Sequence, residues 1–402
     1  MKRKAVVTGM GVVSPIGIGL ASFRRGLQGG LSGLAPITRF DTSRFPVKSA
    51  CEVKDFNPSG RSTHLLDPFI RYAAAATEEA LADARFEVSQ MDPFRIGISV
   101  SSSKGGMHTL DRLRERFESN PSALLGARLY ANAVPNFAAQ WIARRWKIQG
   151  PAKCYVAACA TGTVSVIEGA RMIEEGEADY CLAGASDASI VPLMLAGYRQ
   201  MKVLSPDGMR PFDRRRKGFV VGEGAGILFL ESEESAQRRG AKIYGKILNW
   251  AHSSYTGGDA LRANEEDPAL SWALQRTLER SGLQAGDIHY INLHGTGTAS
   301  GDLYETSEIK KAFGREAYRI PTSSTKSMTG HLLGASGAVE IIATLLAMQE
   351  GFIPPTVGLE KPDPQCDLDY TPGRSRAAKI SCALSLSMGF GGHISTVALS
   401  RN

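Results

Sequence analysis

Short apolar segments and longer Ala-rich segments alternate along the 402-residue chain. Runs rich in Val, Ile and Leu predict strands, because branched side chains pack well on a pleated sheet. Longer segments with apolar residues three or four positions apart predict helices. We predict strands over residues 4–8, 95–101, 154–157, 180–184, 227–230, 243–250, 288–293, 380–387 and 394–399. We predict helices over residues 72–84, 134–146, 161–175, 268–281 and 338–349. The alternation favours an α/β fold in which helices cover sheets.

One helical segment occurs twice. Residues 160–176 (ATGTVSVIEGARMIEEG) align without a gap with residues 335–351 (ASGAVEIIATLLAMQEG), and residues 222–227 (GEGAGI) weakly match residues 389–394 (GFGGHI). Chance similarity between Ala- and Gly-rich helices is one explanation. The other is a duplication, with two similar halves that join near residues 231–240 and each place a helix N-terminus at a common centre. The identical pairs of the longer match are Ala160/Ala335, Gly162/Gly337, Val164/Val339, Ile167/Ile342, Glu175/Glu350 and Gly176/Gly351.

Composition excludes several classes of protein. Hydrophobic residues make up 43% of the chain and charged residues 22%, as is typical of a folded soluble protein and not of a disordered or fibrous one. No apolar run approaches the ~20 residues that a membrane helix needs. The basic, apolar start is interrupted by Thr8, Gly9 and Gly11, so we interpret it as the first strand of a cytoplasmic protein and not as a signal peptide. The six cysteines are scattered without a CxxC pair, which favours reduced thiols and no metal site.

The formal net charge is +7. A basic surface suits a nucleic acid, an anionic lipid or an acidic protein partner. The longest basic run, residues 214–217, is short and adjoins a Gly-rich segment, which argues against a nucleic-acid arm. The segment TGMGVVS lacks one glycine of a dinucleotide fingerprint, and no acidic partner follows at the required distance. We therefore expect no nucleotide, nucleic-acid or membrane ligand.

Cys159 is the candidate nucleophile. It lies in VAACATGTVS, between a predicted strand and a predicted helix, and small residues flank it. A sulfur at a helix N-terminus is favoured as the thiolate by unpaired N–H groups and the helix dipole. The alternative is an inert core cysteine, because free cysteines are often buried.

His294 directly follows a predicted strand and opens the segment HGTGTASGD. A histidine at the carboxyl end of a strand, followed by glycines, predicts a side chain that faces a cleft. Lys326 and His331 lie in STKSMTGHLLGASG, which precedes the second copy of the repeated helix, and Glu340 lies inside that helix. Glu340 is placed to orient either Lys326 or a backbone loop. A structural histidine, a solvated lysine and a surface carboxylate are the respective alternatives.

The segment GFGGH links the two final predicted strands, and its glycines permit a close approach of substrate to the backbone. Phe390 is its one bulky residue and is either a gate or a hairpin aromatic. A cysteine suits covalent capture of a thioester. Two neutral histidines are suited to stabilise an enolate formed from a second thioester.

Taken together, the motifs resemble those of β-ketoacyl-[acyl-carrier-protein] synthases of class II, which are condensing enzymes of the thiolase-like fold. The matching motifs are ACATGT, RPFDRRRKGFVVGEGAG, HGTGTASGD, STKSMTGHLLGASG and GFGG, and the similarity covers essentially the whole chain. The resemblance implies two pseudo-duplicated halves in a layered α-β-α-β-α architecture. Residues 1–235 would carry the nucleophile, and residues 236–402 would carry both histidines and the lysine.

The resemblance also implies a role for each catalytic candidate. Cys159 would be the acylated nucleophile, and His294 and His331 would bind the malonyl thioester carbonyl. Lys326 would belong to the same network, with Glu340 supporting it. An acyl group would move from a carrier protein to the cysteine, malonyl carrier would lose CO2, and the enolate would attack the acyl thioester. The product would be a 3-ketoacyl carrier protein extended by two carbons, in fatty-acid or type II polyketide or polyene biosynthesis.

Substrate-binding residues are implied in the same way. Phe219 would lie near the departing carboxylate, and Thr296 and Thr298 would line the pantetheine arm. Phe390 would gate the acyl pocket, and its N–H would join that of Cys159 in an oxyanion hole. The other candidates for substrate binding are Gly389, Gly391, Lys104 and Leu129.

No metal or nucleotide cofactor is implied, since the acyl groups ride on the 4′-phosphopantetheine of an acyl carrier protein. Carrier proteins are acidic, and the basic net charge agrees with such a partner. The residues that resemble the carrier-docking face are Arg61, Arg71, Lys202, Arg210 and Arg214, each of which is alternatively a solvated charge.

Two features depart from the fatty-acid members of the family. Those members usually carry a small or apolar residue at the position of Lys104, near the floor of the acyl pocket at the dimer interface. An unpaired buried charge beside a saturated chain is costly. The third residue of HGTGT also differs from many fatty-acid members. We therefore hypothesise an acyl substrate unlike a plain saturated chain.

Three other functions are considered. A non-catalytic partner subunit typically lacks the nucleophile, so Cys159 argues against it. A degradative thiolase needs a second cysteine near the C-terminus, and GFGGH has none. A catalytic ketosynthase subunit that is active only as a heterodimer with a chain-length-factor-like partner stays open, as does the choice between homodimer and heterodimer.

Overall fold

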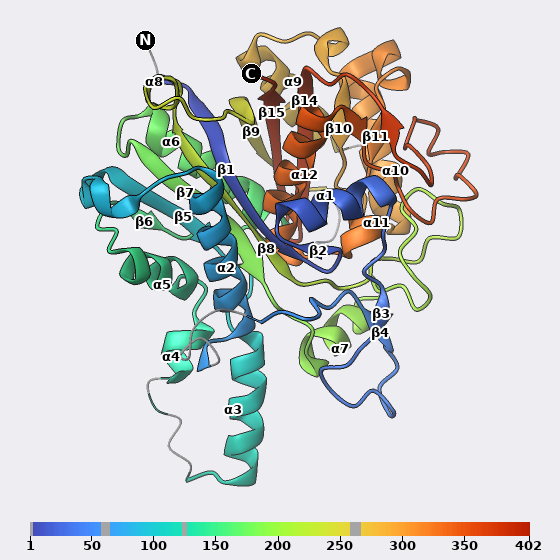
Figure 1. The fold of residues 1–402 in the computed structure, drawn as a ribbon. Coiled ribbons are helices and arrows are strands. Elements are labelled where there is room, and N and C mark those ends of the chain that lie inside the picture. The colour runs from blue at the N-terminus through green and yellow to red at the C-terminus, as the bar shows by residue number, and fades with distance from the viewer. Residues whose placement is uncertain (1–2, 58–64, 123–125, 127, 258–266) are drawn as a thin grey trace.

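The computed structural model describes residues 3–57, 65–122, 126, 128–257 and 267–402. Most of its described strands join one eleven-stranded mixed sheet (Figure 1). The first half of the chain contributes β1 (Ala5–Ser14), β5 (Ile96–Ser101), β6 (Ala152–Lys153), β7 (Tyr180–Asp187) and β8 (Gly224–Ser232). The second half contributes β9 (Gly245–Ser254), β10 (Tyr290–Asn292), β11 (Thr322–Ser323), β14 (Cys382–Gly389) and β15 (His393–Ser400).

The two halves repeat one strand order. The sheet runs β11-β10-β14-β15-β9-β1-β8-β7-β5-β6, and β2 (Gly17–Ile18) pairs with β1. The five strands that each half contributes to this path, with β2 left aside, can be numbered 1 to 5 in chain order. Both halves then have the strand order 3-2-4-5-1 from the outer edge to the centre of the sheet. The parallel and antiparallel pairings also agree, and the halves meet where β1 pairs antiparallel with β9. The predicted duplication is therefore confirmed.

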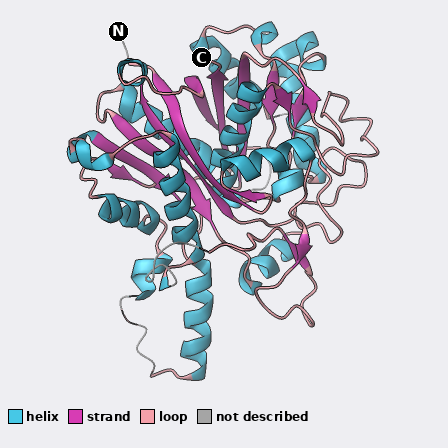
Figure 2. Cartoon of the chain, viewed as in Figure 1, coloured by secondary structure: helices cyan, strands magenta, loops and turns pink. Residues whose placement is uncertain are grey.

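Helices cover the sheet in layers (Figure 2). The twelve α-helices of the described chain are α1 (Leu20–Gly29), α2 (Pro68–Asp83), α3 (Met107–Ser119), α4 (Arg128–Ala133), α5 (Phe137–Trp146), α6 (Thr161–Glu174), α7 (Pro192–Gln200), α8 (Glu233–Arg238), α9 (Ala269–Ser281), α10 (Ala299–Phe313), α11 (Lys326–Thr329) and α12 (Ser336–Glu350). α2 and α5 pack on the outer face of the first half, α9 and α10 lie outside the second, and α6 and α12 lie between the two halves. The expected α-β-α-β-α layering is thus present.

Three apolar clusters correspond to these layers. Phe69 of α2 packs with Ile98 and Phe229 of the first half of the sheet. Leu270 of α9 packs with Leu384 on the outside of the second half. The central cluster contains the apolar residues of α6 and α12, among them Val166, Ile167, Val339 and Ile342. α12 is buried along nearly its whole length, and apolar residues predominate on all of its sides, with Glu340 as a buried charged exception.

α6 and α12 approach each other through glycines at matched positions of the internal repeat. A Cβ on Gly162 would lie 2.6 Å from the Ala338 nitrogen and 2.8 Å from the Gly334 carbonyl oxygen. A Cβ on Gly337 would lie 2.7 Å from the Thr163 nitrogen. All three distances are too short for a real Cβ, so the two backbones are in direct contact. This contact brings the starts of both helices to one centre.

The structure corrects some expected elements. Residues 154–157 are not a strand, because the chain leaves the sheet after β6 and the Tyr155 N–H donates to the Ser101 hydroxyl at 2.9 Å. The helix α10 was not predicted. Its buried residues include the carboxylates of Asp302, Glu305 and Glu308, and these interrupt the apolar stripe by which a helix is recognised in a sequence.

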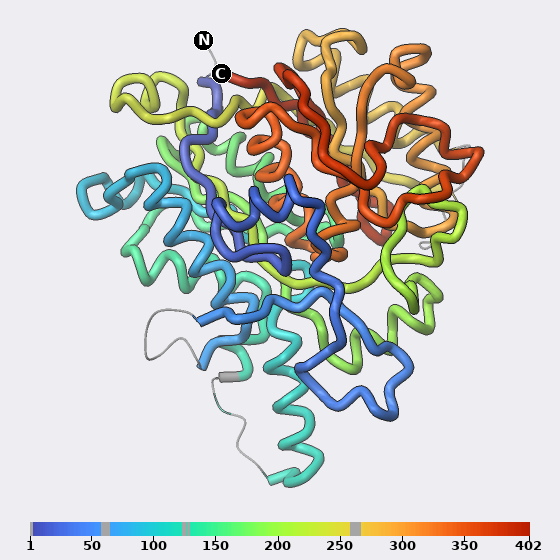
Figure 3. Tube along the Cα trace, turned by 45° about the vertical axis from the view of Figure 1, so that its right-hand side comes forward, coloured from blue at the N-terminus to red at the C-terminus, as the bar shows by residue number. Residues whose placement is uncertain are grey.

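Short paired strands complete the described part of the chain: β3 (Ala35–Pro36) with β4 (Ser49–Ala50), and β12 (Phe352–Ile353) with β13 (Arg376–Ala377). α3 projects away from the body of the molecule in both ribbon and tube views (Figure 3). Within the described ranges, no helix has the length and apolar character needed to cross a membrane.

We predict that Gly162→Ala lowers the free energy of unfolding by about 1–3 kcal/mol, because an overpacked contact must separate the helices. Gly197→Ala in α7 is the matched control, since a Cβ there meets no atom within 4 Å. The control should stabilise by about 0.5–1 kcal/mol through helix propensity. Urea denaturation measures both changes. Equal stability of Gly162→Ala and the unsubstituted protein would contradict the close contact.

Candidate active site

A cavity of about 670 Å³ lies where the two halves meet. Its wall includes Cys159 from the first half and His294 and His331 from the second. Phe219 and Phe390 add aromatic surface to the same wall. The structure therefore brings together the predicted nucleophile and both predicted histidines, although 172 positions separate Cys159 from His331 in the chain.

Cys159 lies in a tight 3₁₀ turn, Ala158–Ala160, directly before α6. Ala158 has a φ of 47°, in the left-handed region that non-glycine residues seldom adopt. The Thr161 hydroxyl holds the turn, since it accepts the Ala157 N–H at 2.9 Å and donates to the Ala158 carbonyl at 2.7 Å. Gly389 packs against the turn, and a Cβ there would lie 3.1 Å from the Cys159 nitrogen.

Burial raises the pKa of the Cys159 thiol to about 11. The positive charges of Lys104 and Lys326 and the Phe390 N–H act in the opposite direction and lower this pKa. The expectation that the helix start would favour the thiolate thus meets an opposing cost of desolvation. The two lysines, and not the helix alone, supply the local positive charge.

His294 is held in place through its own backbone. Glu305 of α10 is fully buried, and its carboxylate accepts the N–H of His294 at 2.6 Å and of Gly295 at 2.8 Å. Burial, followed by the charge of Lys326 and by His331, lowers the pKa of His294 well below its ordinary value. Its ring is therefore neutral at physiological pH. Its Nδ1 is buried without a hydrogen-bond partner among the described residues.

His331 has a defined tautomer. Its Nδ1 lies 3.3 Å from the Leu333 N–H, which donates to it, and 3.0 Å from the Ser336 hydroxyl. Since Nδ1 accepts, the ring proton lies on Nε2. Burial and the charges of Lys326 and Lys104 lower the pKa of His331 well below its ordinary value. The two rings lie edge to face with centroids 5.7 Å apart, and Phe219 packs against His331 at 4.9 Å.

Lys326 is fully buried and forms an ion pair with Glu340. Lys326 lies at the start of α11, and Glu340 lies in α12. Removing one partner of such a pair leaves an uncompensated buried charge, which costs about 3–5 kcal/mol. The pair keeps a positive charge close to both imidazoles, and this charge adds to the effect of burial in lowering the pKa of both rings.

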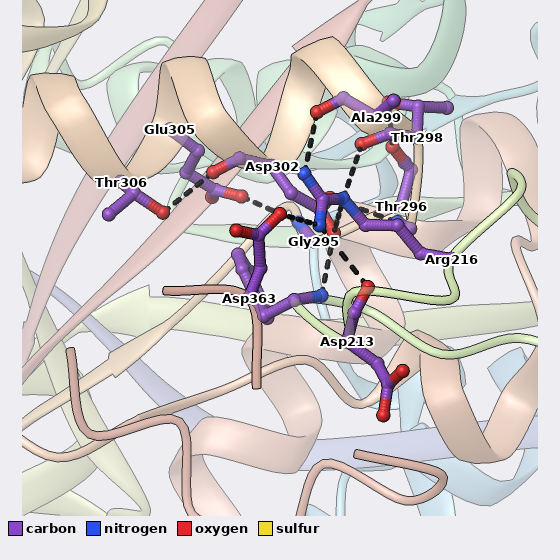
Figure 4. Close-up of polar contacts among 12 residues, drawn as sticks. Asp213, Arg216, Gly295, Thr296, Thr298, Ala299, Asp302, Glu305, Thr306 and Asp363 are labelled. Atoms are coloured by element: carbon purple, nitrogen blue, oxygen red, sulfur yellow. Dashed lines mark hydrogen bonds and ion pairs between the residues drawn. The ribbon is translucent and has the colours of Figure 1, made fainter. Parts of the chain in front are cut away.

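The loop after His294 is braced by residues that the sequence reasoning missed (Figure 4). Asp302 accepts the N–H of Gly297 at 3.0 Å and of Phe212 at 2.7 Å. Arg216 donates to the carbonyls of Thr298 at 3.2 Å and Ala299 at 2.8 Å, and to Asp363 at 2.6 Å. Asp302 and Glu305 follow the GTGT loop three residues apart, and this spacing of carboxylates was the available signal.

Other substrate-binding candidates divide into two groups. Thr296, Thr298 and Gly389 line the cavity, together with the Phe219 and Phe390 already named. Gly391, with a φ of 85°, is exposed at the tip of the β14–β15 turn and lies outside the cavity wall. Leu129 on α4 and Lys104 after β5 are also absent from the wall, although the charge of Lys104 reaches Cys159.

Carrier-docking candidates are dispersed. Lys202 is exposed at the rim of the cavity, where the equally exposed Lys217 joins it. Arg214 is exposed, and Arg210 pairs with Asp207 at 3.2 Å. The Arg71 guanidinium lies over the Phe56 ring at 5.5 Å in a separate cavity. Arg61 lies outside the described residues.

The chain matches the β-ketoacyl synthase N-terminal domain over residues 2–236 and the β-ketoacyl synthase C-terminal domain over residues 244–360. The chain therefore belongs to the β-ketoacyl synthase family. It is 39% identical to a 3-oxoacyl-[acyl-carrier-protein] synthase 2 of Synechocystis sp., with 100% of this chain and 98% of the relative covered. It is 37% identical to the 3-oxoacyl-[acyl-carrier-protein] synthase 2 of Coxiella burnetii, with 100% and 99% covered.

Solved structures of ketosynthases are similar to this chain over their full length. The ishigamide ketosynthase/chain length factor superimposes with a TM-score of 0.94 at 33% identity, and each chain is covered completely. A type II PKS acyl-carrier protein in complex with its ketosynthase, bound to the hexaketide, gives a TM-score of 0.91 at 29% identity, again with complete coverage of both chains. These ketosynthases share the mixed sheet and its covering helices, which confirms the expected fold.

We predict that Lys104→Ile raises the pKa of the Cys159 thiol, because it removes a nearby positive charge. Alkylation by iodoacetamide at pH 8, followed by intact-mass spectrometry, should become about two- to tenfold slower. Lys202→Met is the control, since that exposed charge is screened by solvent and should change the rate little. Unchanged alkylation in Lys104→Ile would show that the thiol does not sense this lysine.

Proposed function

We propose that this chain is a 3-oxoacyl-[acyl-carrier-protein] synthase that performs a decarboxylative Claisen condensation. The observation that carries the proposal is the convergence of Cys159, His294 and His331 on one cavity between the duplicated halves. Cysteine, and not serine, suits a group that must accept and then release an acyl chain, since thioesters exchange readily with thiols. Membership of the β-ketoacyl synthase family supports the same reaction.

In the first step, the sulfur of Cys159 attacks the carbonyl of an acyl thioester on a carrier protein. The bond from that carbonyl to the carrier sulfur breaks, and the carrier leaves as its thiol. The tetrahedral oxyanion is stabilised by the backbone N–H groups of Cys159 and Phe390. The Phe390 N–H already points at the cysteine sulfur in the resting protein, where it lowers the pKa of the thiol. Preorganised N–H donors of this kind form an oxyanion hole.

In the second step, a malonyl thioester enters the same cavity and its terminal C–C bond breaks. CO2 leaves, and the electron pair remains on the enolate of the acetyl thioester. His331 carries its proton on Nε2, and the neutral His294 adjoins it, so both rings are suited to donate hydrogen bonds to the enolate oxygen. Phe219, packed against His331, supplies an apolar surface that favours loss of the carboxylate charge.

In the third step, the enolate carbon attacks the acyl carbonyl on Cys159. The bond from that carbonyl to the Cys159 sulfur breaks, the sulfur leaves as the thiolate, and the 3-ketoacyl carrier is released. We propose the 4′-phosphopantetheine of an acyl carrier protein as the arm that delivers both substrates. Thr296 and Thr298 line the entrance and suit the amides of such an arm. Lys202 and Lys217 at the rim suit the acidic surface of a carrier. The ketosynthase that is structurally similar to this chain is bound to an acyl-carrier protein.

We further propose that a second subunit covers the projecting α3–α4 region and the edge strand β6. Phe117 and Tyr130 are 49% and 68% exposed there, and Val156, shortly after β6, is 58% exposed. Exposed aromatic groups next to an open sheet edge favour pairing with another chain. A homodimer satisfies this geometry, and so does a heterodimer with a chain-length-factor-like subunit, in line with the ishigamide ketosynthase/chain length factor.

We propose that the acyl chain is polar or conjugated and not fully saturated, because the ammonium of Lys104 lies within electrostatic reach of Cys159 and His331. A saturated chain beside this ammonium would deprive the charge of water without replacing its hydrogen bonds. The names of the curated relatives agree with condensation itself, and the polyketide neighbours agree with a chain of this kind.

We predict that incubation with acyl carrier proteins adds the mass of the acyl group to this chain, and that Cys159→Ala abolishes the gain. Intact-mass spectrometry measures both results. A loss of CO2 from malonyl carrier that depends on His294 and His331 tests the second half-reaction. If no carrier acylates the chain even when candidate partner subunits are present, the proposed covalent capture at Cys159 is wrong.

We predict that a carrier bearing a polyene chain acylates Cys159 faster than one bearing a saturated chain of the same length. Lys104→Ile should reverse or remove this preference, by about tenfold in the ratio of rates, since it replaces a charge by an apolar group. Rates of mass gain in parallel reactions provide the measurement. Equal rates for both chains, unchanged by the substitution, would overturn the proposed substrate class.

A further inference from the structure

Asp187 is a buried carboxylate next to the active site, and it has no role in the reaction described above. It closes β7, is fully buried, and has no ion-pair partner within 4 Å among the described residues. Its Oδ1 accepts the Ser102 hydroxyl at 2.6 Å, and its Oδ2 accepts the Ser103 hydroxyl at 2.6 Å and the Ser103 N–H at 3.3 Å. The Gly334 N–H also donates to Oδ2, at 2.6 Å.

Gly334 is the duplicated counterpart of the nucleophile. The repeat that relates Ala160 to Ala335 relates Cys159 to Gly334 and Ala158 to Leu333. Both positions lie in 3₁₀ turns, Ala158–Ala160 before α6 and Leu333–Ala335 before α12. Both turns begin with a non-glycine residue in the left-handed region, with φ of 47° at Ala158 and 53° at Leu333. The backbone turn that carries the nucleophile therefore occurs twice in the chain, once in each half.

The partners of the two turns correspond as well. Gly389 and Asp187 each close the fourth strand of their half, β14 and β7. Gly389 lies against the Cys159 turn, and Asp187 lies against the Gly334 turn. A Cβ on Gly334 would lie 2.5 Å from Asp187 Oδ2 and 2.7 Å from the Ser103 Cβ, so only glycine fits. In one half the turn holds a reactive sulfur, and in the other its N–H is bound by an internal carboxylate.

The Gly334 turn closely follows His331 in the chain and contacts its ring. Leu333, whose left-handed backbone is strained by about 1–3 kcal/mol, donates its N–H to His331 Nδ1. The backbone of His331 is fixed separately, because its N–H donates to the Val220 carbonyl at 2.8 Å and its carbonyl accepts the Gly222 N–H at 2.9 Å. The orientation of the ring therefore depends on the Ser336 hydroxyl and the Phe219 contact and on the Leu333 N–H. That N–H depends in turn on the peptide that Asp187 anchors.

We propose that Asp187 is a positioning residue that holds the Leu333–Gly334 turn and thereby fixes the orientation and tautomer of the His331 ring. The inference rests on the proposed condensation and assigns Asp187 to the malonyl half-reaction, in which His331 acts. Asp187 does not line the cavity wall. The transfer of the acyl group to Cys159 uses the other copy of the turn, so it should depend much less on this carboxylate.

The test separates the two half-reactions in Asp187→Asn. We expect CO2 release from malonyl carrier protein to fall about 10- to 100-fold, because a small misplacement of a catalytic group costs that much. Acylation of Cys159 by acyl carrier protein, measured by intact-mass spectrometry, should not fall, because the charge of Asp187 raises the pKa of the Cys159 thiol and its removal favours the thiolate. Ser103→Ala removes one side-chain hydrogen bond to the carboxylate and keeps the carboxylate itself, so it should give a smaller loss in the same half-reaction, of about three- to tenfold.

Glu231→Gln is the matched control. Glu231 on β8 is also fully buried, and it accepts hydrogen bonds from Thr8 at 2.6 Å and from Arg239 at 2.9 Å. It should leave the ratio of the two half-reactions unchanged, whatever its effect on stability. Equal losses of both half-reactions in Asp187→Asn and in Ser103→Ala, or no loss in either variant, would overturn the inference. If the unsubstituted protein neither acylates Cys159 nor decarboxylates malonyl carrier, the proposed function itself fails, which is a distinguishable result.

Discussion

The site depends on the direct contact between the backbones of α6 and α12. Two helices approach this closely only where glycine replaces larger residues, and Gly162 and Gly337 provide this at matched positions of the repeat. The contact sets the distance between two helix starts, one of which carries Cys159 while the other follows His331. Since both helices are buried between the two halves of the sheet, neither can shift without disturbing an apolar layer. The geometry of the cavity therefore follows from helix packing and not from loop conformation alone.

Buried carboxylates that accept backbone N–H groups recur around this contact. Glu305 holds the peptide nitrogens of His294 and Gly295, Asp302 holds those of Gly297 and Phe212, and Asp187 holds that of Gly334. A charge-assisted hydrogen bond to a peptide nitrogen is stronger than a neutral one and fixes a loop with few contacts. The loops of the site thus keep a defined shape although glycines make them intrinsically flexible.

Positive charge within the site has a complementary effect. Lys326 is buried with Glu340 and lowers the pKa of both His294 and His331. A neutral imidazole donates one hydrogen bond and has one acceptor nitrogen, so a fixed tautomer is needed before it can stabilise an enolate oxygen. The same charges favour the Cys159 thiolate, which burial disfavours. A single buried ion pair therefore influences the nucleophile and both histidines.

The sequence by itself determined much of this protein. Apolar runs located most of the long strands, the repeated segment revealed two equivalent halves, and short motifs identified Cys159, His294 and His331. Tertiary structure decided what periodicity does not encode. α10 was missed because its buried face mixes carboxylates with apolar residues. Asp187 stands outside the quoted motifs, and Arg216 lies in one of them without a role that the motif shows. Their importance arises from partners more than 80 positions away, and only folding brings such partners within hydrogen-bond distance.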